Sequence, residues 1–266
     1  MVDYEPIDQI IVSLSHEMKD NETCYTGVAI PSAVIAIQLA RMTHAPNLEF
    51  FYAGYWISPD FEMDLFGIMT NEEEYRKAIS KAKGFSSLWQ LYQYWEGPMR
   101  TLSFGMIRPA QIDQYGNINN SLIGSPSKPK FRFPGGAAVG DIINTCDHVL
   151  GYIPRHDTRT LVEKVDFITG RGASPEWRKE VGLDMYQGLT TLVSDLAVLE
   201  FDKLGKMRVK SIHENSSAKE VQQNTGFSLD IPEDVPTTIP PTEIEMDILQ
   251  TRADPLAIRN FDSRSR

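Results

Sequence analysis

The sequence contains little cysteine and no spacing of histidine and cysteine that would suggest a metal site. Only Cys24 and Cys146 occur among 266 residues, together with five histidines. A structural zinc site takes about four such ligands at short, regular intervals, so we expect no bound metal. Two cysteines do not make a disulfide framework either, and we expect a cytoplasmic protein with reduced thiols.

Long apolar runs and an excess of basic residues are also missing. No stretch approaches the roughly 20 apolar residues of a membrane span, and the acidic start, MVDYE, lacks the apolar core of a secretion signal. The formal net charge is −10, whereas nucleic-acid and anionic-membrane surfaces require basic faces. We therefore expect no nucleic-acid partner and no membrane partner. The hydrophobic share of 41% and charged share of 23% are typical of a globular protein.

Helical and strand patterns alternate along most of the chain. An amphipathic helix is predicted at the start, because apolar residues recur at helical spacing: Ile7, Ile10, Ile11, Leu14 and Met18. Pro31 suits the first turn of a second helix. Strands are predicted at residues 24–29, 48–52, 102–107, 148–153, 161–168, 191–201 and 207–212. This alternation indicates an α/β protein.

The last part of the chain has a different character. Four prolines interrupt the pattern and predict a stiff linker: Pro232, Pro236, Pro240 and Pro241. Apolar residues over 244–249 then predict a short docking helix, followed by a charged tail. We expect an α/β domain over residues 1–231, and a linker with a docking helix over 232–266.

Residues 109–119, PAQIDQYGNIN, are the most informative stretch. They follow the apolar strand predicted at 102–107 and are rich in turn-forming and amide residues. Such a turn places Gln111, Asn117 and Asn119 at the rim of a sheet, where open α/β proteins bind their ligands. A well-formed turn without a ligand is the alternative interpretation.

The same stretch resembles a signature of family I coenzyme A transferases, specifically the B (beta) subunit of the glutaconate CoA-transferase group. The similarity continues at residues 26–31 (TGVAIP), 44–47 (HAPN), 134–137 (PGGA) and 217–227 (SAKEVQQNTGF). The last of these reads as a short helix with Gly226 suited to its C-cap. The resemblance implies a single open α/β domain of the CoA-transferase type, with a mostly parallel sheet flanked by helices. It also implies an A-type (alpha) partner subunit in an α2β2 heterotetramer, with coenzyme A as part of the substrate and no bound cofactor.

One position departs from the family pattern. Where the family has the glutamate that attacks the acyl-CoA, directly after the central strand, this chain has Ala53. A methyl group cannot attack a thioester. Glu49 lies four residues earlier, roughly 13 Å away at about 3.3 Å per residue. Asp60 and Glu62 would reach the position only if their loop folded back. The catalytic residue therefore stays unknown, and the missing glutamate indicates the branch without it.

The resemblance places the substrate-binding residues at the end of the central strand, in the polar turn and in a glycine loop. They are Ala53, Gly54, Tyr55, Gln111, Asn117, Asn119, Gly135, Gly136 and Ala137. Backbone N–H groups of Gly135 and Gly136 are candidates to stabilise an enolate or oxyanion, and a tight turn needing positive φ is their alternative role. A basic cluster at Lys128, Lys130 and Arg132 would suit the phosphates of coenzyme A or be a solvated turn.

Three functions remain open. The first is an acyl-CoA-processing enzyme that cleaves a carbon–carbon bond by hydrolytic ring opening or decarboxylation. The second is a genuine CoA transferase acting between an acyl-CoA and a carboxylic acid. The third is a non-catalytic structural subunit that shapes the pocket of an active partner. Ala53 favours the first.

Overall fold

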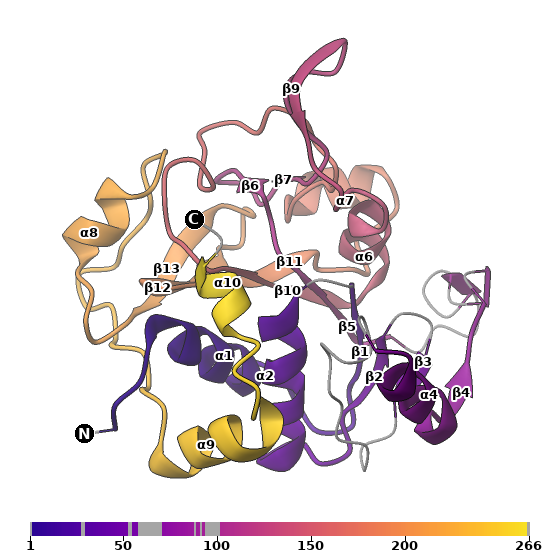
Figure 1. Cartoon of the computed structure of the whole chain (residues 1–266). Helices are drawn as coiled ribbons and strands as arrows, with labels where there is room; N and C mark the ends of the chain where they lie inside the picture. The colour runs from indigo at the N-terminus through magenta and orange to yellow at the C-terminus, as the bar shows by residue number, and fades with distance from the viewer. Residues whose placement is uncertain are drawn as a thin grey trace. The chain divides into compact units, whose positions relative to one another are not determined.

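The computed structural model describes residues 2–27, 30–52, 55–57, 71–87, 89–90, 92–93 and 102–264 (Figure 1). Contacts divide the chain into two compact units. The first unit comprises Met1–Met106 and Pro241–Arg266, and the second comprises Ile107–Pro240. The predicted boundary after residue 231 stays a prediction. No helix in the described ranges is long and apolar enough to cross a membrane.

The N-terminal part of the first unit contains five strands and the helices α1, α2 and α4. Its elements are α1 (Pro6–His16), β1 (Thr23–Thr26), α2 (Pro31–Met42), β2 (Glu49–Tyr52), β3 (Tyr55–Ile57), α4 (Glu72–Lys81), β4 (Gly84–Phe85) and β5 (Phe104–Ile107). The strand order is β5-β1-β2-β3-β4. Strand β1 pairs in parallel with β5 and β2, whereas β3 pairs antiparallel with β2 and β4.

Both predicted N-terminal helices are confirmed. A capping box between Glu5 and Asp8 starts α1, with Pro6 in its first turn, and Pro31 opens α2 in the same way. Their apolar residues are buried. The strand expected over 24–29 is observed as β1, which ends at Thr26, and residues 28–29 lie outside the described ranges.

The predicted C-terminal docking helix is also observed. Helix α9 (Glu243–Ile248) begins with a capping box between Thr242 and Glu245 and continues as the π-helix η1 (Leu249–Ala253). The apolar side chains of Met246 and Leu249 are buried. The helix α10 (Asn260–Arg264) follows.

Two polar contacts fix this C-terminal segment to α1 and α2. Arg259, whose side chain is 11% exposed, pairs with Asp8 of α1 at 2.7 Å and with Asp254 at 2.8 Å. The carboxylate of Asp262 accepts hydrogen bonds from the backbone N–H and the hydroxyl of Ser32, in the first turn of α2. Asp262 therefore caps a helix that has no side-chain cap of its own.

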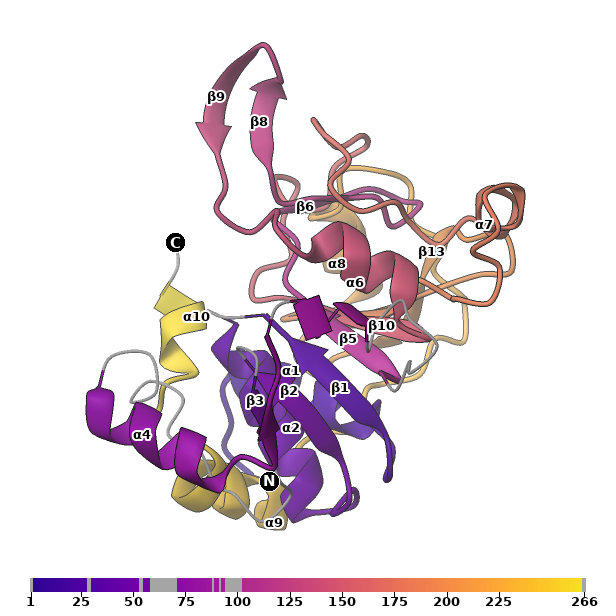
Figure 2. The same ribbon diagram turned by 90° about the vertical axis from the view of Figure 1, so that its right-hand side faces the viewer.

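The second unit is built around four strands and two short ribbons. Its first elements are β6 (Gln111–Ile112), β7 (Ile118–Asn119), β8 (Leu122–Ser125), β9 (Lys128–Arg132), α6 (Val139–Thr145) and β10 (His148–Ile153). The rest are α7 (Pro175–Glu180), β11 (Leu189–Ser194), β12 (Ala197–Phe201), β13 (Met207–Ile212) and α8 (Ala218–Gln223). β10 and β11 pair in parallel, and β12 and β13 follow antiparallel. Ribbons β6–β7 and β8–β9 are separate two-stranded sheets, and Figure 2 shows β8–β9 extending away from the other elements of this unit.

Each unit combines parallel and antiparallel strand pairs with helices, so the predicted α/β class is confirmed. Three local predictions are wrong. The strand expected at 191–201 is a hairpin, because the side chain of Ser194 accepts hydrogen bonds from the N–H groups of Leu196 and Ala197 and so supports a reversal of the chain. The strand expected at 161–168 is an irregular segment with bends, in which only Leu161 forms an isolated bridge, to Ile112.

The third wrong prediction concerns Gly226. The C-cap of α8 is Asn224, and Gly226 has no positive φ. The N–H of Gly226 donates to the carbonyl of Leu161 at 2.8 Å. A Cβ on residue 226 would lie 2.4 Å from that oxygen. Glycine is thus required here for close backbone approach rather than for helix termination.

We predict that Arg259→Ala destabilises the protein by about 3 kcal/mol or more, because it leaves two buried carboxylates without their cation. Urea unfolding of the full chain measures the change. Arg159→Ala is the matched control, since Arg159 pairs with Asp157 at 2.9 Å but is exposed, and a loss of at most about 1 kcal/mol is expected. Equal effects of the two substitutions would contradict the role given to Arg259.

Candidate functional site

The polar stretch at 109–119 forms ribbon β6–β7 and its connecting turn. The carboxylate of Asp113 accepts from the N–H of Tyr115 at 3.0 Å and from the side-chain amide of Asn117 at 2.9 Å. Burial raises the pKa of Asp113, and its hydrogen bonds with Asn117 and Tyr115 oppose this shift. Gly116 has φ 73, the left-handed conformation that this turn requires. Asn117 in turn accepts the N–H of Gly172 at 3.0 Å.

Gln111 and Asn119 face each other across the ribbon. The side-chain oxygen of Gln111 accepts from Asn119 at 2.7 Å and from the N–H of Asp166 at 3.1 Å, and its amide donates to the Asp166 carboxylate at 3.1 Å. Asn119 is fully buried and also bonds the backbone of Ser121 and Leu122. These two amides thus connect ribbon β6–β7 to Asp166 and to the start of β8.

Three residues that the sequence analysis did not identify continue this network. Asn120 accepts from the N–H of Ala110 at 2.7 Å and donates to the carbonyl of Arg108 at 3.1 Å. Its own N–H donates to the hydroxyl of Thr169 at 2.9 Å, and Thr169 bonds the hydroxyl of Ser121 at 2.7 Å. The only sequence signal was the position of Asn120 and Ser121 directly after the motif.

The glycine loop at 134–137 packs against these residues. A Cβ on Gly136 would lie 2.9 Å from the Ser121 hydroxyl and 3.5 Å from the Asn120 carbonyl, and one on Gly135 would lie 3.6 Å from the Asn120 side chain. Neither glycine has positive φ, so the alternative interpretation as a turn needing positive φ is wrong.

The loop also presents unused donors. Gly135 and Ala137 are exposed and Gly136 is partly exposed. Within the part of the chain that the structure describes, no group accepts a hydrogen bond from their backbone N–H groups. These N–H groups are therefore available to an oxygen of a bound molecule.

The predicted site at the end of the central strand is only partly described. Ala53 and Gly54 lie outside the described ranges, as do Asp60 and Glu62. The backbone of Tyr55 begins β3 and pairs with Tyr52. Glu49 starts β2, at the end opposite to Ala53, and its carboxylate pairs with Lys83, in agreement with the argument against Glu49 as nucleophile.

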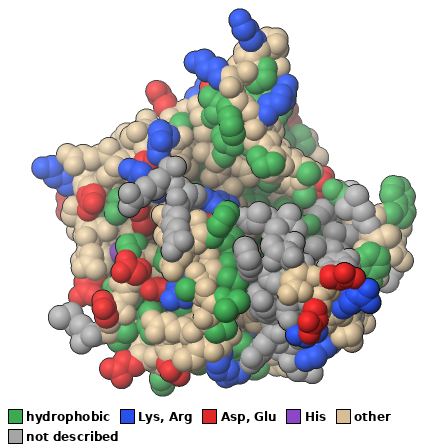
Figure 3. Space-filling model, in the orientation of Figure 1, with side chains coloured by type: hydrophobic (Ala, Val, Ile, Leu, Met, Phe, Trp, Pro, Cys, Tyr) green, Lys and Arg blue, Asp and Glu red, His purple; other side chains and the backbone are tan. Residues whose placement is uncertain are grey.

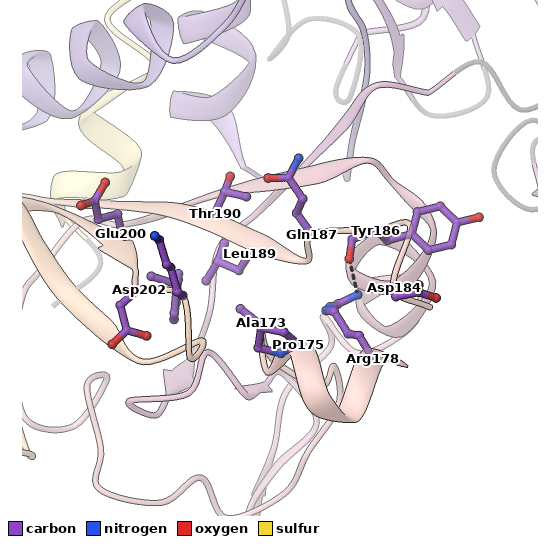
Figure 4. Close-up of a pocket in the computed structure, with 12 residues that line it drawn as sticks. Ala173, Pro175, Arg178, Asp184, Tyr186, Gln187, Leu189, Thr190, Glu200 and Asp202 are labelled. Carbon is purple, nitrogen blue, oxygen red and sulfur yellow. Dashed lines mark hydrogen bonds between the residues drawn. The ribbon is translucent and has the colours of Figure 1, made fainter. Parts of the chain in front are cut away.

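A cavity of about 390 Å³ in the second unit lies among α7, β11 and the end of β12 (Figure 4). None of the predicted site residues lines it. Its buried Arg178 donates to the carbonyls of Ile143 at 3.1 Å and Gly172 at 3.2 Å, and burial lowers the pKa of Arg178 to about 10. Glu200 pairs with Arg208 at 2.9 Å. Since these charged groups serve the fold, we assign no ligand to the cavity.

Two histidines are buried beside Ser194. His156 bonds the hydroxyls of Ser194 at 2.8 Å and Thr225 at 2.9 Å, and His213 bonds the Ser194 carbonyl at 2.8 Å. Burial lowers the pKa of His156 to about 4 and lowers the pKa of His213. Both side chains are neutral at pH 7 and enclosed by the protein, so they are structural.

Among the described residues no group of three His, Cys, Asp or Glu side chains is placed to hold a metal ion.

We predict that the protein loses stability as the pH falls from about 6.5 to about 4. In this window the unfolded chain protonates His156, whereas the folded chain keeps it neutral, so the free energy of unfolding decreases by up to about 3 kcal/mol. Urea unfolding at several pH values measures this slope. His156→Gln, which retains hydrogen-bonding groups but does not titrate, should reduce the slope. An unchanged slope would contradict the assignment.

Comparison with known proteins identifies the family. The model of the family described as coenzyme A transferase matches residues 7–224. The chain belongs to the coenzyme A transferase family. The resemblance carried by the polar turn and the glycine loop is thereby confirmed.

Individual proteins are similar over nearly the whole chain. The B subunit of 3-oxoadipate CoA-transferase from Pseudomonas knackmussii is 29% identical over 250 residues, which cover 93% of this chain and 92% of that protein. The cholesterol ring-cleaving hydrolase IpdB subunit of Mycobacterium tuberculosis is 26% identical and aligned over 88% of both chains. The crystal structure of the decarboxylase AibA/AibB superposes with a TM-score of 0.80 at 25% identity, covering 97% of this chain and 98% of that chain.

Proposed function

We propose that this chain is the B-type subunit of a heteromeric enzyme that acts on an acyl-CoA thioester together with an A-type subunit, in an α2β2 complex. Family membership supports the substrate class. The similar proteins are named as B subunits or as members of two-component enzymes, which supports the partner. Coenzyme A enters as part of the substrate, and no separate cofactor is proposed. The thiols of Cys24 and Cys146 are buried and form no disulfide, which is compatible with the cytoplasmic location that we propose.

The reaction that we propose is carbon–carbon bond cleavage, by hydrolytic ring opening or decarboxylation, rather than transfer of coenzyme A. The observation that carries this proposal is Ala53, at the position where the family signature has its glutamate nucleophile. The similarity to a ring-cleaving hydrolase subunit and to a decarboxylase supports it. Transfer is the second candidate, because the similarity to the B subunit of 3-oxoadipate CoA-transferase covers 93% of the chain.

The proposed reaction requires hydrogen-bond donors that stabilise negative charge on the thioester oxygen. Cleavage next to a thioester carbonyl develops an enolate or oxyanion, and the free N–H groups of the loop at 134–137 are suited to stabilise it. One such donor is typically worth about 3 kcal/mol in the barrier. We propose that the general base comes from the A-type subunit or from a bound water.

The reaction type is tested with the co-expressed complex of both subunits. Acyl-CoA consumption is measured with and without labelled acetate or succinate as the acceptor acid. Consumption without any acceptor, and no label in the CoA ester, is the expected result. Label entering the CoA ester at the rate of substrate loss would restore the transferase interpretation.

The loop is tested through Gly136. We predict that Gly136→Ala displaces the Ser121 hydroxyl, because the new Cβ would lie 2.9 Å from it, and lowers kcat by about 10-fold or more if the loop donors shift from the oxyanion. The double variant Gly136→Ala with Ser121→Gly removes this contact and should recover part of kcat. Ser121→Gly alone is the matched control. Wild-type kcat in the Gly136→Ala complex would exclude the loop from catalysis.

A further inference from the structure

Hairpin β8–β9 and its flanking residues, 121–134, form an extension that we call the basic arm. β8 pairs only with β9, in a sheet of two strands. Two-stranded ribbons without a packed face are marginally stable in water. The arm extends from the second unit in both ribbon views (Figures 1 and 2).

The charge of the arm is opposite to that of the chain. It carries Lys128, Lys130 and Arg132 and no acidic residue. Because the whole chain has a net charge of −10, the remaining residues carry −10 − 3 = −13. All three cations are exposed, and no carboxylate of the described residues pairs with them. The arm therefore presents unneutralised positive charge.

Large apolar side chains accompany these cations. Phe131 is 57% exposed and packs edge-on against Phe133, with ring centroids 5.1 Å apart. Phe167 and Ile168, which are 37% and 45% exposed, precede Thr169, the residue bonded to Ser121 at the base of the arm. Figure 3 shows hydrophobic and basic side chains together over the hairpin. Exposed aromatic residues beside cations are typical of protein–protein contact surfaces.

The arm also leads into the candidate catalytic loop. The N–H of Phe133 donates to the carbonyl of Ser121 at 2.9 Å, which closes the base of the hairpin. The loop at 134–137 with its free N–H groups follows immediately. A partner that orients the arm therefore also orients the loop at 134–137, because the two are continuous in the chain. A partner that supplies the missing catalytic group has to approach this loop.

We propose that the basic arm docks the A-type subunit, with Phe131 and the three cations entering an acidic, apolar-lined groove of that partner. This inference rests on the proposed function, because it assumes a second subunit. Docking positions the loop at 134–137 against the substrate. The partner surface is recognised by its chemistry, a carboxylate-rich groove that can also hold an aromatic ring.

The test compares two variants of equal charge change. Lys128, Lys130 and Arg132 are all replaced by Glu in the arm variant, and exposed Lys179, Lys203 and Lys219 are all replaced by Glu in the control. The dissociation constant for the purified A-type subunit is measured at low and high salt by biolayer interferometry. The arm variant should bind at least about tenfold more weakly, and the control should change by less than about threefold. Phe131→Ala, which keeps the charge, should also weaken binding by about tenfold.

The other outcomes identify what else the arm does. Equal weakening by the arm variant and the control would overturn the proposal, as would wild-type affinity of both arm variants. Normal assembly with lost binding of free coenzyme A, measured by calorimetry, would assign the arm to the phosphates instead. Loss of self-association of the isolated chain, seen by light scattering, would assign it to a second copy. If the wild-type chain does not bind any A-type subunit, the proposed function itself fails.

Discussion

Buried backbone groups must find hydrogen-bond partners, and much of the second unit has no sheet to provide them. Residues 154–174 contain no helix and no strand. Backbone carbonyls of ribbon β6–β7 accept some N–H groups of this segment, among them those of Val162 and Thr169, and side-chain amides accept others. Asn117 accepts the N–H of Gly172, Gln111 accepts that of Asp166, and Asn120 accepts that of Ala110. The polar motif at 109–119 thus stabilises the irregular segment 154–174. The loop at 134–137 packs against Asn120 and Ser121, directly after the motif.

In the first unit, charged side chains satisfy a helix N-terminus and pair with each other in the interior. α2 begins without a side-chain cap, and its first turn is satisfied by Asp262, 230 residues later. Arg259 then joins α1 to the same C-terminal segment through buried carboxylates. Removal of one partner from such a network costs far more than its formation contributes. The C-terminal residues are therefore part of the packing of this unit.

Much of the fold could be predicted from the sequence, because its signals are local. The apolar spacing of α1, the proline at the start of α2, and the alternation along β13 each lie within a single element. The hairpin at β11–β12 was missed because apolar residues on both sides concealed the reversal at Ser194. The irregular segment at 161–168 was mistaken for a strand because a strand requires a neighbouring strand, which a single segment cannot reveal. For the site, the motif identified the region, but the contact of Asn120 with Thr169 spans 49 residues and has no local signature.

At position 178, a lysine would not replace the arginine. Its guanidinium is buried against carbonyl groups, and burial lowers its pKa to about 10. It therefore remains protonated at neutral pH without a carboxylate to stabilise it. A lysine starts from a pKa of about 10.4, so a similar shift would bring it near the pH of the cell and leave it partly neutral. The tolerance of arginine for dehydration thus lets one side chain hold several turns together over the whole physiological pH range.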